Sequence, residues 1–495
     1  MVTTIGIIGA GFAGLATAKT LREFGFDVTV FEKDTEVGGV WSSSRRYPGL
    51  TTQNVRSTYA LSDYPYPSDY PEWPTGEQVQ RYLAGYAETF GLTDCIHLES
   101  TVQSATQDAS TGRWTLRIDP LGDREFDFLI ICNGIYSEPF VPAFEGQDDF
   151  EAAGGRICHT VDFHEAEEAR DRHVLVVGYG KSSCDVANAV VGTSASARVV
   201  ARHLVWKIPR KFANKLNFKM LLLTRMGENL FPYRELHGME KFLHGPGKPV
   251  RDSMLSTVES VIRRQFALED LDLVPDGPLE TIVNGTVSLE TPGFFPNVAA
   301  GLIVVDRETV IERLQPGQAV LSNGTTVPCD VVVCGTGFLQ QVPFLEPEVQ
   351  AKVTDGDGNF LLYRQMLPVG VSQLAFNGYN SSFFSQLNAE AGALWIAGYL
   401  LGYLDLPTES ERVTAINDRL RWTLERTGGT SSKGTNIVPF SMHNVDEVLG
   451  DLGLKLSRAT RAKEWLLPVD PSDYSRARVA LLKQHEDATA ELVPV

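Results

Sequence analysis

The chain has 495 residues, of which 43% are apolar and 21% are charged, and 62 acidic against 44 basic residues give a net charge of −18 at pH 7. This length predicts two or three globular units, and the negative charge argues against nucleic acid as a partner. Six cysteines without a CxxC pair favour neither a disulfide framework nor a zinc site, so we expect no bound metal.

The first predicted unit begins at the N-terminus. An apolar strand, the turn GAGFAG and an Ala/Leu-rich helix follow one another over residues 4–25. In such a turn Gly9, Gly11 and Gly14 provide a tight bend, access for a pyrophosphate and close packing of helix on strand. The next strand ends on Glu32, whose carboxylate can accept hydrogen bonds from a ribose 2′-hydroxyl and would repel a 2′-phosphate. The pattern therefore predicts FAD or NAD here, and not NADP.

The chain then passes through a long segment before a second unit. A Tyr/Pro-rich loop over 34–74 is expected to cover a site, because loops of this length are usually functional or disordered. Thr75 and Gln78 predict a capping box for the following helix. A buried strand is predicted over 126–134, and the Pro-rich segment 136–146 is the expected crossover between units.

A second strand–turn–helix pattern begins at His173. Gly178 and Gly180 follow an apolar strand, and Ser183 stands where a third glycine is expected. The next strand ends on Arg202, with two further cations close behind, and a cation in this position suits the 2′-phosphate of NADP. The alternative is a structural βαβ unit that binds nothing.

Two turns with opposite charge preferences predict permanently bound FAD and NADPH as a diffusible hydride donor. We expect an α/β protein of two Rossmann-like dinucleotide-binding domains, with the NADP domain inserted into a discontinuous FAD domain. The predicted boundaries are 1–165 for the first part of the FAD domain, 166–305 for the NADPH-binding domain with an irregular helical insert, and 306–495 for the second part of the FAD domain and C-terminal helices. The segment 206–302 has the weakest patterns, and its aromatic and basic start is expected to be packed helix, substrate channel or membrane surface.

The sequence also bears on location and assembly. The chain opens without a basic leader or cleavage site, and its longest apolar stretch, Ala393 to Leu404, is too short to span a bilayer. We therefore expect a cytoplasmic protein with no transmembrane segment. The stretch around 393–404 is expected to be a core helix, with a homodimer face as the alternative.

Several motifs together resemble the flavin-containing monooxygenases, within the class B flavoprotein monooxygenases. They are GAGFAG with Glu32, GGVW at 38–41, SDYPYP at 62–67, GYGKSSCD at 178–185, CGTGF at 334–338, and GRICHTVDF, in which Gly155, His159 and Phe163 have the spacing GxxxHxxx(Y/F). The leading Phe of that last motif is displaced to Phe150. The resemblance covers most of the chain.

The resemblance implies a mechanism and a set of cofactor-binding residues. NADPH would reduce FAD, O2 would form a flavin C4a-hydroperoxide, and the distal oxygen atom would pass to a nitrogen or sulfur centre of a small-molecule substrate. This chemistry needs a dry, preorganised pocket. The residues expected to bind the cofactors are Gly9, Gly11, Phe12, Ala13, Gly14, Glu32, Lys33, Gly39, Val40, Trp41, Thr52, Val102, Asn133, Gly134, Gly178, Tyr179, Gly180, Lys181, Ser182, Ser183, Arg202, Thr336 and Gly337.

The catalytic position is less well defined. Where the family has an Asn beside the reactive edge of the flavin, this chain has Gln53 followed by Asn54, and either amide could serve; an Asx or Gln turn without a catalytic role is the alternative. His159 is expected to be a hinge residue. Because the motif ends on Phe163, without the Trp-Pro or Trp-Asp ending of Baeyer–Villiger enzymes, ketone oxygenation is the second enzymatic hypothesis. A non-oxygenating FAD/NADP-binding redox sensor is the hypothesis from another class, and the missing cysteine pair disfavours a disulfide reductase.

Overall fold

The computed structural model describes residues 2–285, 288–429 and 433–490. The N-terminal unit is built on a five-stranded parallel sheet in the order β24–β7–β1–β2–β3. Its central strand, β1, is almost completely buried, as expected for an Ile-rich strand covered on both faces. The strands are β1 (Thr4–Ile8), β2 (Asp27–Phe31), β3 (Ile96–His97), β7 (Phe128–Ile131) and β24 (Leu374–Phe376).

The second unit has its own five-stranded parallel sheet, in the order β16–β11–β10–β20–β9. Its strands are β9 (Arg156–His159), β10 (His173–Val177), β11 (Ser196–Ala201), β16 (Ile303–Arg307) and β20 (Val331–Cys334). Strands β9 and β20 lie in this sheet although the predicted boundaries at 165 and 306 assign both to the FAD domain. The strand pairing therefore supports a longer insertion than the one expected from the sequence.

The two units are joined by a short antiparallel ribbon. Strand β8 (Glu138–Pro139), on the way into the second unit, pairs with β21 (Phe338–Leu339), on the way back. Each unit also carries a three-stranded antiparallel sheet. In the first unit its strands are β4 (Thr101–Gln107), β5 (Trp114–Asp119) and β6 (Gly122–Phe126). In the second unit they are β17 (Ile311–Gln315), β18 (Gln318–Leu321) and β19 (Thr326–Pro328). Strands β4 and β5 form an antiparallel hairpin, and the turn between β18 and β19 contains Asn323 and Gly324.

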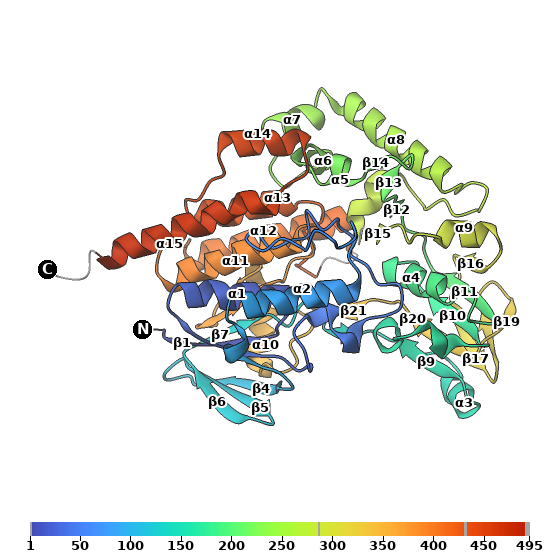
Figure 1. Cartoon of the computed structure of the whole chain (residues 1–495), viewed down its shortest axis with the longest axis horizontal. Helices are drawn as coiled ribbons and strands as arrows, with labels where there is room; N and C mark the ends of the chain where they lie inside the picture. The colour runs from blue at the N-terminus through green and yellow to red at the C-terminus, as the bar shows by residue number, and fades with distance from the viewer. Residues whose placement is uncertain (1, 286–287, 430–432, 491–495) are drawn as a thin grey trace.

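Helices cover the first sheet in layers. Helix α1 (Phe12–Glu23) packs against α11 (Ser385–Leu400), which packs in turn against α13 (Ser441–Asp451), so α11 lies in the core as predicted (Figure 1). Helix α2 (Gly76–Thr89) begins with the predicted capping box of Thr75 and Gln78. The other helices of the two sheet regions are α3 (Gln147–Ala152), α4 (Lys181–Ala189), α9 (Phe294–Ala299) and α10 (Pro347–Val353).

Within the segment 206–302, residues 219–265 form a helical cap, seen at the top of Figure 1. It contains α5 (Lys219–Leu222), α6 (Arg225–Asn229), α7 (Met239–Leu243) and α8 (Lys248–Gln265), beside the C-terminal helices α12 (Glu409–Thr427) and α14 (Arg458–Leu466). The last helix, α15 (Ser475–Ala490), lies away from the cap and contacts α1. Short strand pairs complete the structure: β12 (Lys207–Ile208) with β15 (Ser288–Leu289), β13 (Lys211–Phe212) with β14 (Leu216–Asn217), and β22 (Leu362–Tyr363) with β23 (Leu367–Pro368).

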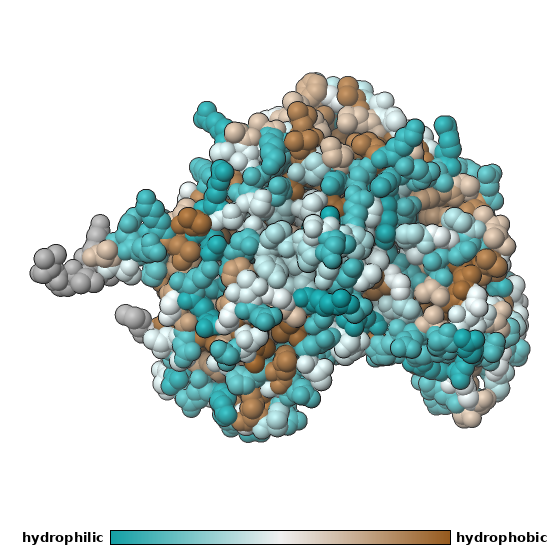
Figure 2. Space-filling view, viewed as in Figure 1, coloured by the Kyte–Doolittle hydropathy of each residue, from teal (hydrophilic) through white to brown (hydrophobic). Residues whose placement is uncertain are grey.

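The surface of the cap is mixed. Exposed apolar side chains on α7 and α8 include Phe242 and Val250, and Figure 2 shows apolar residues gathered at this upper edge among hydrophilic ones. Among the described helices, none combines the length and apolar character that a membrane crossing requires.

Candidate functional site

The first glycine-rich turn has the geometry that a dinucleotide phosphate site requires. Gly9 adopts φ +103°, and a Cβ there would lie 2.6 Å from the carbonyl oxygen of Cys132. A Cβ on Gly14 would lie 1.8 Å from the carbonyl oxygen of Gly9, so only glycine lets α1 pack this closely on β1. Helix α1 starts after Gly11 without a capping side chain. Its first N–H groups are therefore available to a phosphate.

Glu32 stands at the end of β2 as the sequence predicts. One carboxylate oxygen accepts the N–H of Ala10 at 2.7 Å, and the other accepts the N–H of Asp34 at 3.1 Å. Burial raises the pKa of this carboxyl, and the two backbone donors act against that rise. Each oxygen keeps lone-pair capacity for a further donor, so the carboxylate fits the ribose hydroxyl of FAD.

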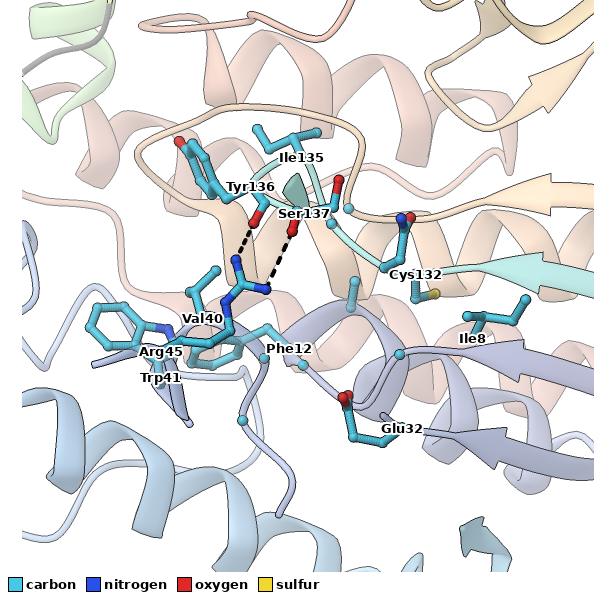
Figure 3. A pocket seen from close by; sticks show the side chains of 18 of the residues that line it. Ile8, Phe12, Glu32, Val40, Trp41, Arg45, Cys132, Ile135, Tyr136 and Ser137 are labelled. Carbon is cyan, nitrogen blue, oxygen red and sulfur yellow. Dashed lines mark hydrogen bonds between the residues drawn. The ribbon is translucent and has the colours of Figure 1, made fainter. Parts of the chain in front are cut away.

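A cavity of about 340 Å³ follows this turn (Figure 3). Its volume lies in the range of ligand pockets. Twelve of the predicted cofactor residues line it: Gly9, Gly11, Phe12, Ala13, Glu32, Lys33, Gly39, Val40, Trp41, Val102, Asn133 and Gly134. Gly14 does not line the cavity; it packs against the carbonyl group of Gly9. The residues present thus fit an elongated dinucleotide such as FAD.

The far wall of the cavity comes from a segment that the sequence analysis missed. Gly378, Ser381 and Ser382 follow β24, and Ser385 begins α11. We expected Thr336 and Gly337 to fill this part of the site. Instead the Thr336 hydroxyl donates to the Phe140 carbonyl, and the Gly337 carbonyl accepts from the backbone N–H of Phe140 at 3.1 Å, so both stabilise the crossover ribbon. No glycine-rich motif marks the segment after β24, and the register of β24 beside β7 is what brings it here.

The second turn repeats the geometry of the first. Gly178 has φ +105°, and α4 begins after Gly180 without a capping side chain. A Cβ on Gly180 would meet no described atom within 4 Å, so the space before the helix N-terminus is open to a ligand. The turn therefore fits a dinucleotide phosphate, as predicted for NADPH.

Ser183 occupies the position of the missing third glycine. Its hydroxyl donates weakly to the carbonyl groups of Val177 and Gly335, at 3.5 and 3.4 Å. A Cβ on Gly335 would lie only 2.0 Å from the Ser183 hydroxyl oxygen. The glycine that allows close packing thus stands on the facing strand end, after β20, instead of on the helix.

The basic residues around the second turn divide into two groups. Arg202 is exposed directly after β11, which is where a 2′-phosphate would bind. Lys207 is buried beneath the turn, donating to the carbonyl of Tyr179 and, at 2.9 Å, to the hydroxyl of Ser288. The Lys181 ammonium forms a buried ion pair with Asp185. Only Arg202 among these cations presents its charge to solvent at the predicted phosphate position.

The loop 47–54 connects the two sites. The Tyr47 hydroxyl lies 3.5 Å from the carboxylate of Asp185 on α4. The Gln53 carbonyl oxygen accepts the N–H of Leu289 at 3.0 Å, so this amide is engaged with β15. Thr52, predicted as a cofactor residue, is buried and donates to the Asn54 carbonyl at 2.7 Å. Its side chain therefore shapes the loop.

Asn54 has a different environment from Gln53. Its amide nitrogen donates to the carbonyl of Phe383, between the cavity-lining Ser382 and Ser385. Its side-chain oxygen is buried, and no donor within the described part of the chain reaches it. A buried carbonyl oxygen without a donor is costly, so this atom fits an N–H or O–H group of a bound ligand.

His159 lies at the junction of the units. Its Nε2 lies 3.0 Å from the Gly337 carbonyl, and its Nδ1 accepts the N–H of Val161 at 3.3 Å. Burial lowers the pKa of the imidazole, and the Gly337 carbonyl partly offsets this. The residue is 1% exposed, and its hinge role stays a prediction. The displaced Phe150 packs on Gly155 of the same motif.

Within residues 2–285, 288–429 and 433–490, no group of three or more His, Cys, Asp or Glu side chains is arranged to hold a metal ion. Two dinucleotide sites joined by one loop instead define a two-nucleotide flavoprotein.

Comparison with known proteins identifies the family. The model of the family described as "Flavin-binding monooxygenase-like" matches residues 2–457, and the chain belongs to this family. Flavin-containing monooxygenase 3 of Homo sapiens is 25% identical over 489 residues, which cover 94% of this chain and 85% of that protein. The chain is thus a flavin-dependent monooxygenase that uses FAD and NADPH.

Solved structures share the fold. S-allyl-L-cysteine S-oxygenase from Allium sativum superposes with a TM-score of 0.65 at 20% identity, covering 99% of both chains. NADP⁺-bound cyclohexanone monooxygenase from Rhodococcus sp. Phi1 gives a TM-score of 0.66 at 16% identity, covering 99% of this chain and 98% of the other. At these identities the likeness concerns the architecture: two Rossmann-like units, one inserted into the other.

Proposed function

We propose that this enzyme transfers one oxygen atom of O2 to a nitrogen or sulfur centre of a small molecule, with NADPH as the reductant. The observation that carries the proposal is the loop 47–54, which touches α4 of the NADP unit through Tyr47 and the wall of the FAD cavity through Asn54. When bound, FAD accepts a hydride from NADPH and activates O2. The residues of the chain must then orient both nucleotides and exclude water.

Asn54 is the proposed catalytic amide. Its free oxygen is fixed in place because its nitrogen is held by Phe383, so it can accept a hydrogen bond without reorganising. Gln53 is proposed to position the loop through Leu289.

An aromatic wall is proposed to keep the cavity dry. Phe12 and Trp41 line the cavity together with Tyr59. The centre of the Tyr59 ring lies 5.5 Å from that of Phe12 and 6.0 Å from that of Trp41, and both contacts are edge-on. Burial raises the pKa of Tyr59 well above its usual range, so the phenol stays neutral. An apolar, neutral wall limits the access of water and stray protons.

The preference for nitrogen or sulfur over ketones rests on the linker motif. It ends on Phe163, which is fully buried, in place of the Trp-containing ending expected of Baeyer–Villiger enzymes. The S-oxygenase among the structural neighbours agrees with this choice, whereas cyclohexanone monooxygenase represents the alternative. A cytoplasmic location and the absence of a nucleic-acid partner belong to the same proposal.

The test is turnover of the purified holoenzyme with NADPH and O2 against a tertiary amine, a thioether and a cyclic ketone. We expect the N-oxide or the sulfoxide by mass spectrometry, with NADPH consumed in step with product. Ester formation from the ketone alone would favour the Baeyer–Villiger alternative. Bound FAD without NADPH consumption for any substrate would favour a redox sensor.

A further inference from the structure

Arg45 lines the FAD cavity and also contacts the segment that connects the two units. It ends a short 3-10 helix, Ser43–Arg45, and its side chain lines the cavity. One guanidinium nitrogen donates to the carbonyl of Tyr136, and the other lies 3.5 Å from the carbonyl of Ser137 (Figure 3). Arg45 therefore links the cavity wall to the chain segment that leads into the NADP unit.

The protein compensates the charge of Arg45 only in part, through carboxylates that are not paired with it. No ion pair within the described ranges includes this guanidinium. Its Nε is buried and has no hydrogen-bond partner among those residues. Burial lowers the pKa of Arg45, although the more distant carboxylates of Asp34 and Glu32 favour its charged form. Arg45 itself is half-buried, and a guanidinium in that environment without a paired anion would be stabilised by an anion of a bound ligand.

The same guanidinium contacts the hinge between the units. Its central carbon lies 5.8 Å from the ring centre of Phe338, on the returning strand β21. That ring also contacts Tyr136 at 5.5 Å and His159 at 4.9 Å, both in edge-on geometry. Arg45 thus touches the outgoing crossover through two carbonyl groups and the returning one through an aromatic ring.

We infer that Arg45 binds the diphosphate of a bound dinucleotide and holds the hinge carbonyl groups at the same time. Three properties support this: the cavity position, the unpaired buried Nε, and the planar fork of arginine, which suits phosphate oxygens. Both FAD and NADP contain a diphosphate. Arg45 lines the cavity assigned to FAD, and it also contacts the crossover segment that leads into the NADP unit. Binding of either nucleotide would then fix the orientation of the two units.

Binding measurements test this inference without turnover. The apoprotein is titrated with FAD by flavin fluorescence, and the FAD-loaded protein is titrated with NADP⁺ by tryptophan fluorescence. We expect Arg45→Met to weaken one of the two affinities about tenfold or more, because hydrogen bonds to charged groups contribute that much. Arg45→Lys, which keeps the charge and loses the fork, should lie between Arg45→Met and the wild type.

Arg46→Met is the matched control. This neighbour loses the same charge, but its guanidinium donates to the Trp41 carbonyl at 3.2 Å and does not line the cavity. The affinities of Arg46→Met should stay within about twofold of the wild type, because this guanidinium does not line the cavity and so makes no contact with the nucleotide there. If Arg45→Met loses affinity for FAD alone, Arg45 binds the diphosphate of FAD. If it loses affinity for NADP⁺ alone, Arg45 binds the diphosphate of NADP.

Salt dependence separates a phosphate contact from a merely structural role. In the wild type the affected affinity should fall as ionic strength rises, and in Arg45→Met it should fall less steeply. Unchanged affinities in Arg45→Met, or equal weakening at every salt concentration, would overturn the inference. If Arg45→Met does not fold, Arg45→Lys gives the same decision, since wild-type affinity in that variant, which keeps the charge and loses the fork, would also overturn the inference.

Discussion

Asn54 and Gln53 are adjacent amides with different hydrogen bonds, and this difference separates their proposed roles. Gln53 gives its oxygen to the backbone of β15, whereas Asn54 keeps a buried oxygen free beside the cavity. The sequence could not distinguish them, because either amide satisfies the motif. The distinction depends on which backbone groups the fold brings to each side chain.

Replacing Asn54 by Ala should uncouple the reaction. We expect oxygenated product per NADPH to fall about tenfold and H2O2 to rise, since one hydrogen bond to a ligand contributes about 1.5 kcal/mol. Mass spectrometry and a peroxidase assay measure the two products, and FAD content checks that the cofactor is retained. Gln53→Ala is the comparison and should change coupling less. Equal coupling losses in the two variants would contradict the assignment to Asn54.

At the scale of elements, Ser183 and Gly335 share one packing function. Local sequence predicts the turn before α4, because glycines after an apolar strand are a short-range signal. It does not show that the small residue needed for close packing stands about 150 residues later, at the end of β20.

Gly335→Ala should therefore clash with the Ser183 hydroxyl, from which the new Cβ would lie 2.0 Å away. Overpacking of this kind costs about 1–3 kcal/mol, so we expect a lower unfolding midpoint and weaker NADP⁺ binding. Adding Ser183→Gly should restore most of both, which thermal unfolding and NADP⁺ titration would show. A double variant no better than Gly335→Ala would argue against a direct clash.

Elements defined by local patterns could be predicted, and those defined by distant pairing could not. Both strand–turn–helix units and the Thr75 capping box match the prediction. Strands β9 and β20 were assigned to the wrong unit, since nothing in a short Val-rich strand indicates which sheet it joins. Ser381 and Ser382 were missed for the same reason: ordinary serines reach the cavity only through the register of β24.

Across the whole molecule, a charged triad joins the cap to the C-terminal helices. His443 on α13 lies 2.6 Å from a carboxylate oxygen of Glu228 on α6 and 2.8 Å from one of Glu240 on α7. Burial alone would lower the pKa of His443, but the two carboxylates outweigh it and raise the pKa to about 10. The imidazolium is therefore retained at neutral pH.

This triad predicts a specific pH dependence of stability. The folded-state pKa lies above the unfolded value of about 6.5, so the stabilisation is complete below pH 6.5 or so and declines as pH rises toward 10. The wild type should exceed His443→Gln in unfolding free energy by a few kcal/mol at about pH 6, and by much less near pH 10. Urea unfolding across this range measures the difference, and a gap that stays constant with pH would contradict the assignment.

The ribbon of β8 and β21 brings the two ends of the inserted NADP unit together. Pro139 on the outgoing strand faces Phe338 on the returning one, so the two ends of the insertion are already antiparallel neighbours. Removing everything between them would leave a gap that a tight hairpin turn can close.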